Sequence, residues 1–220
     1  MSGTEATKPQ LLGAAYSVYV RAARLVLLEK GVDHSLVEID IFGAQAVDAA
    51  YLKLHPFARI PTLRHGDFAL YETAAITRYV DEAFPGPALQ PPDTRSRARM
   101  AQMIGIMDSY LYRPLVWGLY VAHDTAAKGG KPADPASLGE AMMKSRLALK
   151  ALADLAQDGT FLQGDRISLA DLHLLPMLAY GRLTAEGRAL IGEQNKLLAW
   201  WEMMQARPSV AATRFAAELS

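Results

Sequence analysis

The first third of the chain alternates between short apolar runs and longer segments in which apolar residues recur every three or four positions. Such a pattern is typical of strands alternating with amphipathic helices. It predicts a strand at 10–14, a helix at about 18–30 that ends at Gly31, and a second strand at 36–40. Apolar residues at helical spacing over 47–54 predict another helical segment.

A β-hairpin is the next predicted feature. Pro61 stands at the head of an apolar strand, where its missing N–H does least harm and the preceding residue is held extended. The dipeptide Gly66-Asp67 predicts a turn between strands at 62–65 and 68–71. Thr73 then offers a hydroxyl side chain for the N-cap of a helix.

Four prolines and one glycine lie within residues 84–92, after the predicted helix has ended near Ala83. This composition predicts a linker and a domain boundary. We therefore expect a flexible N-terminus at 1–9, a first domain at 10–83 and a second domain at 93–220.

The second domain has the pattern of an all-helical fold. Long apolar-periodic segments predict helices at 93–121, with a kink at Pro114, at 135–157 and at 195–206. The sequence Ser168-Leu169-Ala170-Asp171 is a reciprocal N-cap for one more helix. We interpret this cap as a folding element rather than a catalytic one.

Composition and charge exclude several classes of function. The formal net charge is zero and no dense basic cluster is present, which argues against a nucleic-acid partner. The absence of cysteine excludes disulfides and thiol chemistry by the protein itself. His123 and His173 lack partners at metal-ligand spacing, so we expect no metal site.

No apolar run approaches the roughly 18 residues that span a bilayer. Residues 1–9 lack the layout of a signal peptide. We expect a cytoplasmic protein with no membrane partner.

One segment has the features of a binding surface. A backbone edge before Pro61 faces a helix N-terminus that carries an acid, Glu72, and a hydroxyl, Thr73. Helix N-termini favour a carboxylate, and a nearby glutamate favours an ammonium group, so a ligand with an amino-acid head and a peptide-like body would fit. The alternative is an ordinary hairpin that leads into a capped helix.

The same segment resembles the glutathione S-transferases. Their pattern Asn-Pro-x-Gly, a basic or amide residue, Ile or Val, then Pro, is similar to residues 55–61, His-Pro-Phe-Ala-Arg-Ile-Pro. Their Glu-Ser pair at the start of a helix is similar to Glu72-Thr73, and the match covers nearly the whole chain. The resemblance implies an α/β plus all-α fold, in which an N-terminal thioredoxin-like βαβ-ββα domain precedes an all-helical C-terminal domain. It also implies a cytosolic, bacterial, Ser-type transferase with a role in detoxification, and a homodimer.

The resemblance implies that Ser17 stabilises the thiolate of glutathione, the co-substrate. In Ser-type members the activating residue lies fourteen positions before the glycine that closes the first helix, which is Gly31 here. The alternative for Ser17 is simple N-capping of that helix. Tyr16 is a second candidate donor, and Arg21 could support the thiolate electrostatically or form a surface ion pair.

The remaining glutathione contacts follow from the same resemblance. The backbone of Ile60, positioned by Pro61, would pair with the cysteinyl part. Glu72 would bind the γ-glutamyl ammonium and Thr73 the adjacent carboxylate, and Arg59 could reach a glutathione carboxylate.

Three departures from the family pattern concern this binding site. His55 stands in place of the Asn, and Ala58 in place of the Gly. Ala46-Val47 replaces a basic pair that holds the glycyl carboxylate, a role that Lys53 or Arg59 could take over.

The resemblance places an apolar electrophile between the domains, with Met107 and Tyr110 as candidate wall residues. Conjugation is the expected reaction. Glutathione-dependent isomerisation, peroxide reduction or ether cleavage would use the same thiolate. A non-catalytic scaffold that binds a protein partner is the alternative from another class.

Overall fold

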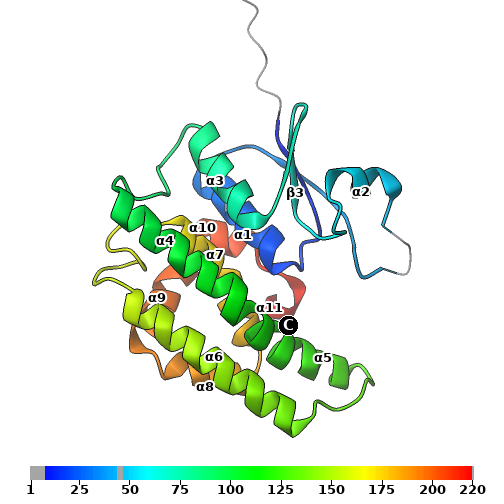
Figure 1. Ribbon diagram of the computed structural model, residues 1–220, viewed down its shortest axis with the longest axis vertical. Helices are drawn as coiled ribbons and strands as arrows, with labels where there is room; N and C mark the ends of the chain where they lie inside the picture. Colours follow the sequence, from blue (N-terminus) through cyan, green and yellow to red (C-terminus); the bar gives the residue numbers. More distant parts are fainter. Residues whose placement is uncertain (1–7, 44–46, 220) are drawn as a thin grey trace, which may run out of the picture. The chain divides into compact units, whose positions relative to one another are not determined.

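The computed structural model describes residues 8–43 and 47–219, and the predicted flexible N-terminus lies outside them except for Lys8 and Pro9. The chain divides into two compact units with the boundary between Ala88 and Leu89, inside the predicted linker segment (Figure 1). Each unit is described by itself below.

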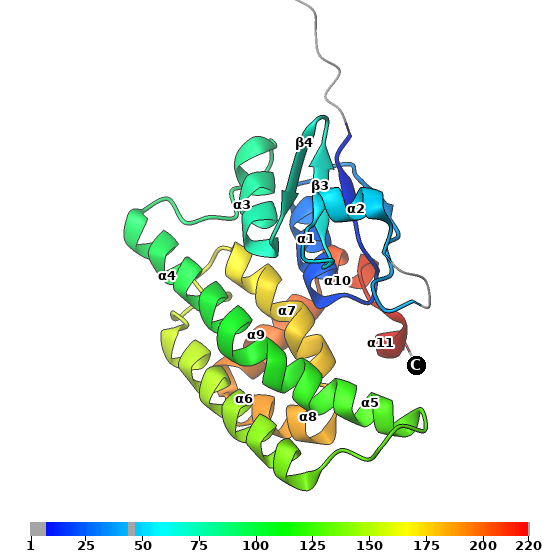
Figure 2. The ribbon, with the colours of Figure 1, turned by 45° about the vertical axis from the view of Figure 1, so that its right-hand side comes forward.

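The first unit is built on a four-stranded mixed sheet of order β2-β1-β3-β4. β1 runs parallel to β2 and antiparallel to β3, and β3 and β4 form an antiparallel hairpin. This confirms the thioredoxin-like fold, and Figure 2 shows the hairpin between α3 on one side and α2 on the other. The elements are β1 (Gln10–Leu12), α1 (Val18–Glu29), β2 (Ser35–Val37), α2 (Ala49–Leu54), β3 (Thr62–His65), β4 (Phe68–Tyr71) and α3 (Thr73–Ala83).

The first two strands are shorter than the predicted 10–14 and 36–40. Gly13 adopts a φ of 156° and turns the chain out of β1 toward α1. A Cβ atom at Gly13 would overlap Val20 Cγ2, so the close approach of this turn to α1 requires glycine.

The chain leaves α1 at Gly31, the glycine at which the sequence predicts the end of this helix. Gly31 has a φ of 69°, the left-handed conformation that glycine adopts without a Cβ penalty. The Gly31 N–H donates to the Leu28 carbonyl and the Val32 N–H to the Leu27 carbonyl, which are the two bonds of a Schellman motif.

The predicted N-cap of α3 is wrong by one residue. The N-cap is Glu72, whose side chain makes no capping bond, and Thr73 is the first residue of the helix. The cause is the backbone of Glu72, which has φ 71° and ψ 115° and turns the chain directly from β4 into the helix.

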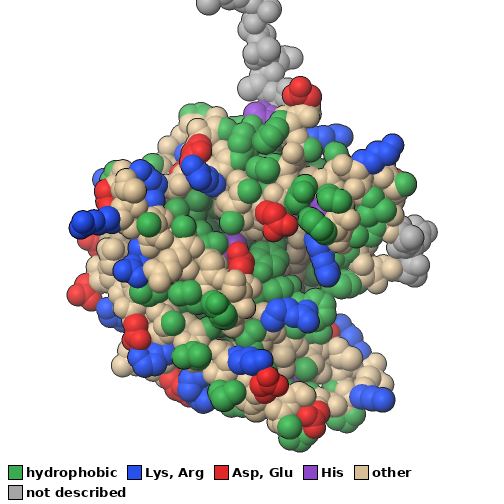
Figure 3. All heavy atoms as spheres, viewed as in Figure 1, with side chains coloured by type: hydrophobic (Ala, Val, Ile, Leu, Met, Phe, Trp, Pro, Cys, Tyr) green, Lys and Arg blue, Asp and Glu red, His purple; other side chains and the backbone are tan. Residues whose placement is uncertain are grey.

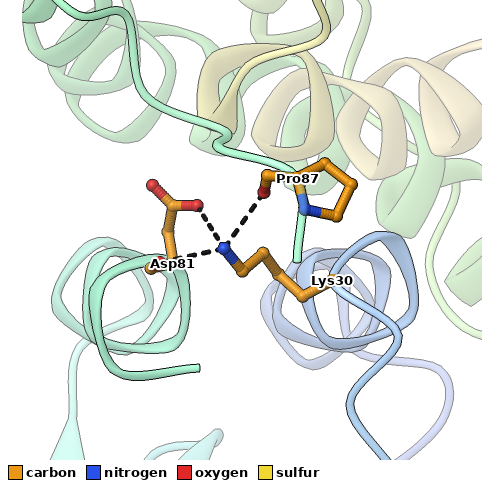
Figure 4. A network of polar contacts seen from close by, with 3 residues as sticks. All are labelled: Lys30, Asp81 and Pro87. Carbon is orange, nitrogen blue, oxygen red and sulfur yellow. Dashed lines mark hydrogen bonds and ion pairs between the residues drawn. The ribbon is translucent and has the colours of Figure 1, made fainter. Parts of the chain in front are cut away.

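A buried ion pair joins the C-terminal ends of α1 and α3. Lys30 Nζ lies 3.1 Å from Asp81 Oδ1, 3.0 Å from the Asp81 carbonyl oxygen and 3.0 Å from the Pro87 carbonyl oxygen (Figure 4). The two side chains are 3% and 5% exposed. All three ammonium N–H groups therefore have an acceptor, and the segment that leaves α3 is fixed to α1.

The second unit is all-helical, as predicted. Its elements are α4 (Thr94–Ile106), η1 (Met107–Leu111), η2 (Arg113–Val121), α5 (Ala122–Ala127), α6 (Pro135–Leu155), α7 (Leu169–Gly181), α8 (Ala185–Gly192), α9 (Asn195–Gln205), α10 (Pro208–Ala212) and α11 (Ala216–Leu219). Around Pro114 the chain forms the π-helical segments η1 and η2 rather than an interrupted α-helix. Wider helical turns of this kind accommodate a residue that cannot donate an N–H.

α7 is the core of the second unit, because every one of its residues is buried. The predicted capping box at Ser168 and Asp171 is confirmed. The Asp171 carboxylate is fully buried and accepts from the Ser168 N–H and hydroxyl, the Leu162 N–H and the Trp200 indole N–H, over 2.6–2.8 Å. The cap therefore also ties α9 and the loop before α7 to the central helix.

Acidic and basic side chains are intermixed on the face seen in Figure 3, in agreement with a formal net charge of zero. None of the helices in the described part of the chain combines the length and the apolar character needed to span a bilayer.

Candidate functional site

Three segments of the first unit converge at one end of its sheet. Leu12, the last residue of β1, pairs with Thr62, the first residue of β3, and Thr62 also pairs with Tyr71, the last residue of β4. The residues that follow β1, precede β3 and follow β4 therefore share one edge. The sequence candidates Ser17, Ile60-Pro61 and Glu72-Thr73 lie in these three segments, within one unit.

Ser17 is the N-cap of α1. Its hydroxyl oxygen accepts from the Val20 N–H at 3.3 Å, so the hydroxyl proton is directed elsewhere. The side chain is half-buried. Both predicted roles are compatible with this geometry, because the oxygen caps the helix while the proton can be donated to an anion.

The structure shows the surroundings of Tyr16 and Arg21, the other two candidates near the thiolate. The Tyr16 hydroxyl donates to Asp40 Oδ1 at 2.7 Å, and burial together with this bond to a carboxylate raises the pKa of the Tyr16 phenol. Its proton is thus committed to Asp40. Arg21 is only 1% exposed, so the alternative of a surface ion pair at Arg21 is wrong.

The segment before β3 is held by Tyr51 of α2. The Tyr51 hydroxyl donates to the Arg59 carbonyl oxygen at 2.6 Å and accepts from the Thr62 hydroxyl at 3.1 Å. Between these two anchors the Ile60-Pro61 peptide bond is cis. The backbone of Ile60 is therefore fixed from both sides.

Ala58, in the same segment, has a φ of 49°. This is the left-handed region, in which a Cβ costs free energy and glycine does not. The structure explains in this way why the family pattern resembled by residues 55–61 has a glycine at that point.

Glu72 combines an exposed carboxylate with a strained backbone. Its φ of 71° and ψ of 115° lie outside the regions that side chains ordinarily adopt. Such strain costs of the order of 1–3 kcal/mol and is concentrated at ligand-binding corners. Thr73, 6% exposed, places its backbone N–H and its hydroxyl at the N-terminus of α3, where an anion is favoured.

The two candidate cations, Arg59 and Lys53, are both exposed. Ala46, at the place of the missing basic pair, lies outside the described residues, and Val47 is the first described residue after that gap. Arg59 is the nearer of the two cations to Ile60 in sequence.

The two candidates for the electrophile wall differ in exposure. Met107 is fully buried, so its interpretation as a pocket residue is wrong: it belongs to the helical core, on the inward face of η1. Tyr110 is 66% exposed. A stripe of apolar residues at helical spacing does not by itself show whether those residues are buried in the core or line a pocket.

His55 is the feature of this region whose surroundings the sequence does not predict. The side chain is 2% exposed, and its Nδ1 atom has no hydrogen-bond partner among the described residues. Burial lowers the pKa of the His55 imidazole, although the nearby Glu72 carboxylate opposes this shift. His55 stands directly before a proline, at the place where the resembled family has Asn, and such a position predicts an exposed turn residue rather than a buried ring.

His173 and His123 each have a carboxylate neighbour. His173 is buried, with Nε2 2.8 Å from Asp108 Oδ1, and His123 Nε2 lies 3.1 Å from Glu186 Oε1. Within residues 8–43 and 47–219, no three His, Asp or Glu side chains are grouped so that they could hold a metal ion.

Comparison with known proteins gives matches along most of the chain. A family profile described as "Glutathione S-transferase, N-terminal domain" matches residues 11–88, and one described as "Glutathione S-transferase, C-terminal domain" matches residues 111–208.

Curated relatives include Glutathione S-transferase F14 of Arabidopsis thaliana, 32% identical over 86% of this chain and 76% of that protein. Glutathione S-transferase F10 of the same plant is 30% identical over 85% of this chain and 87% of that protein.

Solved structures with the same fold include glutathione transferase F7 from Populus trichocarpa. It superposes with a TM-score of 0.81 at 27% identity, over 93% of this chain and 97% of that one. A glutathione S-transferase III in its apo form gives a TM-score of 0.79 at 29% identity, over 94% and 95% of the two chains.

Proposed function

The chain belongs to the glutathione S-transferase family, and from this premise we propose that its first unit binds glutathione, stabilises the thiolate through Ser17, and transfers it to an apolar electrophile. The observation that carries the proposal is the convergence of Ser17, Ile60-Pro61 and Glu72-Thr73 at one end of the sheet. Family membership supports the activity in general, and the residue roles are the proposal.

Ser17 supplies the chemistry of the proposed step. A free thiol has a pKa of about 8.5, so little of it is ionised at neutral pH. The Ser17 proton and the N-terminus of α1 both favour the anion, each by an amount of the order of 1 kcal/mol. The thiolate then attacks the electrophilic carbon, and the leaving group departs with the electron pair of the broken bond.

The other segments bind the remainder of the tripeptide. The N–H and C=O groups of Ile60 pair with the cysteinyl backbone of glutathione in the manner of an added strand. Glu72 binds the γ-glutamyl ammonium, and Thr73 with the N-terminus of α3 binds the α-carboxylate. Arg59 or Lys53 binds the glycyl carboxylate.

The first test is conjugation of a chloronitrobenzene by Ser17→Ala. We expect a loss of about 10²-fold in kcat/KM, because one oriented donor to a stored anion contributes that much. Tyr16→Phe is the matched control in the same turn, and it should retain most of the activity because the Tyr16 proton goes to Asp40. Unchanged activity in Ser17→Ala, or loss only in Tyr16→Phe, would reject the assignment.

Glutathione binding separates the enzyme from a non-catalytic scaffold. At several times Kd, glutathione should stabilise the native state by about 1 kcal/mol or more. No shift in thermal unfolding with millimolar glutathione would favour the scaffold. A panel of isomerase, peroxide and aryl-ether substrates, each assayed with Ser17→Ala as the blank, distinguishes conjugation from the other thiolate reactions.

We further propose a cytoplasmic homodimer, on the basis of family membership. Light scattering tests the assembly: a dimer has twice the mass of one 24.0 kDa chain. The bacterial source that the resemblance implies stays a prediction, since the curated relatives named above are plant proteins.

A further inference from the structure

His55 lies in an aromatic cluster next to the residue that precedes Glu72 of the proposed glutathione site. Its ring centroid is 4.6 Å from that of Tyr71, 6.3 Å from Tyr51 and 6.2 Å from Phe57. Tyr71 is the last residue of β4, directly before the strained Glu72. The imidazole therefore packs against the residue from which the Glu72 corner starts.

The groups that face His55 come from four segments. α2 contributes Tyr51 and β4 contributes Tyr71. The segment before β3 contributes Arg59, whose charge opposes protonation, and the N-cap of α3 contributes Glu72, whose charge favours it. Because burial outweighs the Glu72 charge, the pKa of His55 lies below its usual value of 6.5, and the ring is neutral at neutral pH.

The His55 ring is unusual because its Nδ1 atom is buried and has no hydrogen-bond partner among the described residues. A polar atom without a hydrogen bond costs about 1–3 kcal/mol when it is buried, so an imidazole is an expensive way to fill an aromatic cluster. Protonation would add a positive charge within the electrostatic influence of Glu72, whose carboxylate is proposed to bind the γ-glutamyl ammonium. Two cations would then compete for Glu72.

We propose that His55 is a positioning residue for glutathione, whose neutral ring supports the Tyr71–Glu72 corner and whose protonation weakens the binding of the γ-glutamyl ammonium. The inference rests on the proposed function, and it adds to it a dependence of glutathione affinity on pH. By linkage, a ligand ammonium at Glu72 lowers the proton affinity of His55 as much as a proton on His55 lowers the affinity for the ligand. Binding in mild acid must therefore release protons.

Titration calorimetry with S-methylglutathione tests this coupling in the whole protein. This probe has no ionisable thiol, and its carboxylates and ammonium keep their charges between about pH 5.5 and pH 7.0. We expect Kd to be higher at the lower pH than at the higher one, as for coupling between neighbouring sites. Measurements in two buffers of different ionisation enthalpy should show proton release at the lower pH.

His55→Asn is the informative variant, because the amide keeps a polar side chain that cannot titrate in this range. We expect its Kd to change less than about twofold over the same interval, with no proton release attributable to the side chain. His65→Asn is the matched control. His65 lies at the other end of β3, with Nδ1 2.8 Å from the Tyr79 hydroxyl, and its loss should leave the pH dependence intact.

The outcomes separate the inference from the function on which it rests. Binding by the wild type with the same Kd at both pH values and no proton release overturns the inference alone, and so does an unchanged pH dependence in His55→Asn. No binding of S-methylglutathione at either pH overturns the proposed function and the inference together. The wild-type measurement needs no variant, so the absence of proton release overturns the inference even if His55→Asn does not fold.

Discussion

The Lys30–Asp81 pair gives the sharpest stability prediction. Lys30→Met removes the ammonium but keeps an unbranched side chain of similar length, and it takes the Lys30 charge away from the buried Asp81 carboxylate and from the Pro87 carbonyl. The Lys30 and Asp81 side chains are 3% and 5% exposed, so water cannot replace the lost partner in place. Breaking a buried pair of this kind costs about 3–5 kcal/mol, and we expect the free energy of unfolding to fall by that amount.

The double variant Lys30→Met/Asp81→Leu distinguishes the charge from the packing. Replacement of both ions by apolar groups also removes the buried carboxylate that loses the Lys30 charge in the single variant, so it should recover about 1 kcal/mol or more relative to Lys30→Met alone. Arg78→Met is the matched control on the same helix. Arg78 forms an exposed pair with Glu82, with side chains 69% and 52% exposed, and its loss should cost less than about 1 kcal/mol.

Urea unfolding followed by far-UV circular dichroism measures these differences. All three tryptophans, residues 117, 200 and 201, belong to the second unit, so their fluorescence reports that unit separately. The KM for glutathione should be unchanged in folded Lys30→Met, because the twelve residues of α1 put about 18 Å between Lys30 and Ser17. A Lys30→Met protein as stable as Arg78→Met would refute the reasoning, and so would a double variant no more stable than Lys30→Met.

Two further predictions concern backbone strain and the buried carboxylate. Ala58→Gly should raise the free energy of unfolding by about 0.5–1 kcal/mol, because the φ of 49° costs alanine more than glycine; a lower urea midpoint would contradict this. Asp171→Asn should lower the free energy of unfolding by about 2 kcal/mol or more, because an amide cannot accept from all four donors that face the carboxylate. Thermal unfolding measures the loss, with Ser137→Ala, a change at an exposed serine in the first turn of α6, as the control.

Elements with strong local signals could be predicted from the sequence. The Gly66-Asp67 dipeptide predicts the turn of the hairpin, and Gly31 predicts the end of α1. The Ser168 capping box predicts the start of α7. Each of these signals acts within a few residues, so no tertiary information is needed to interpret it. The short helices α8, α10 and α11 were not predicted, because segments of four to eight residues have too few turns to show a helical period.

Burial within a helix was the least predictable property. Arg21 is 1% exposed and Met107 fully buried, whereas the sequence allowed a surface ion pair for the first and a pocket wall for the second. Periodicity shows that one side of a helix is apolar, but it does not show which neighbours cover that side. For an arginine, moreover, the long aliphatic stem permits burial that the charge alone would argue against.

The failures near the candidate site have a common physical origin. Thr73 was predicted as the N-cap because a hydroxyl is a good cap, yet the chain reaches α3 through the positive φ of Glu72. Ala58 likewise adopts a conformation that its residue type disfavours. Sequence rules describe the unstrained conformation at each position, so they fail where the fold imposes a strained one. Both positions belong to the segments that meet at the sheet edge near Ile60, because Thr62 pairs with Tyr71. The strain at Glu72 is thus itself an argument for a ligand at this corner, because a glycine there would relieve it but would lose the carboxylate.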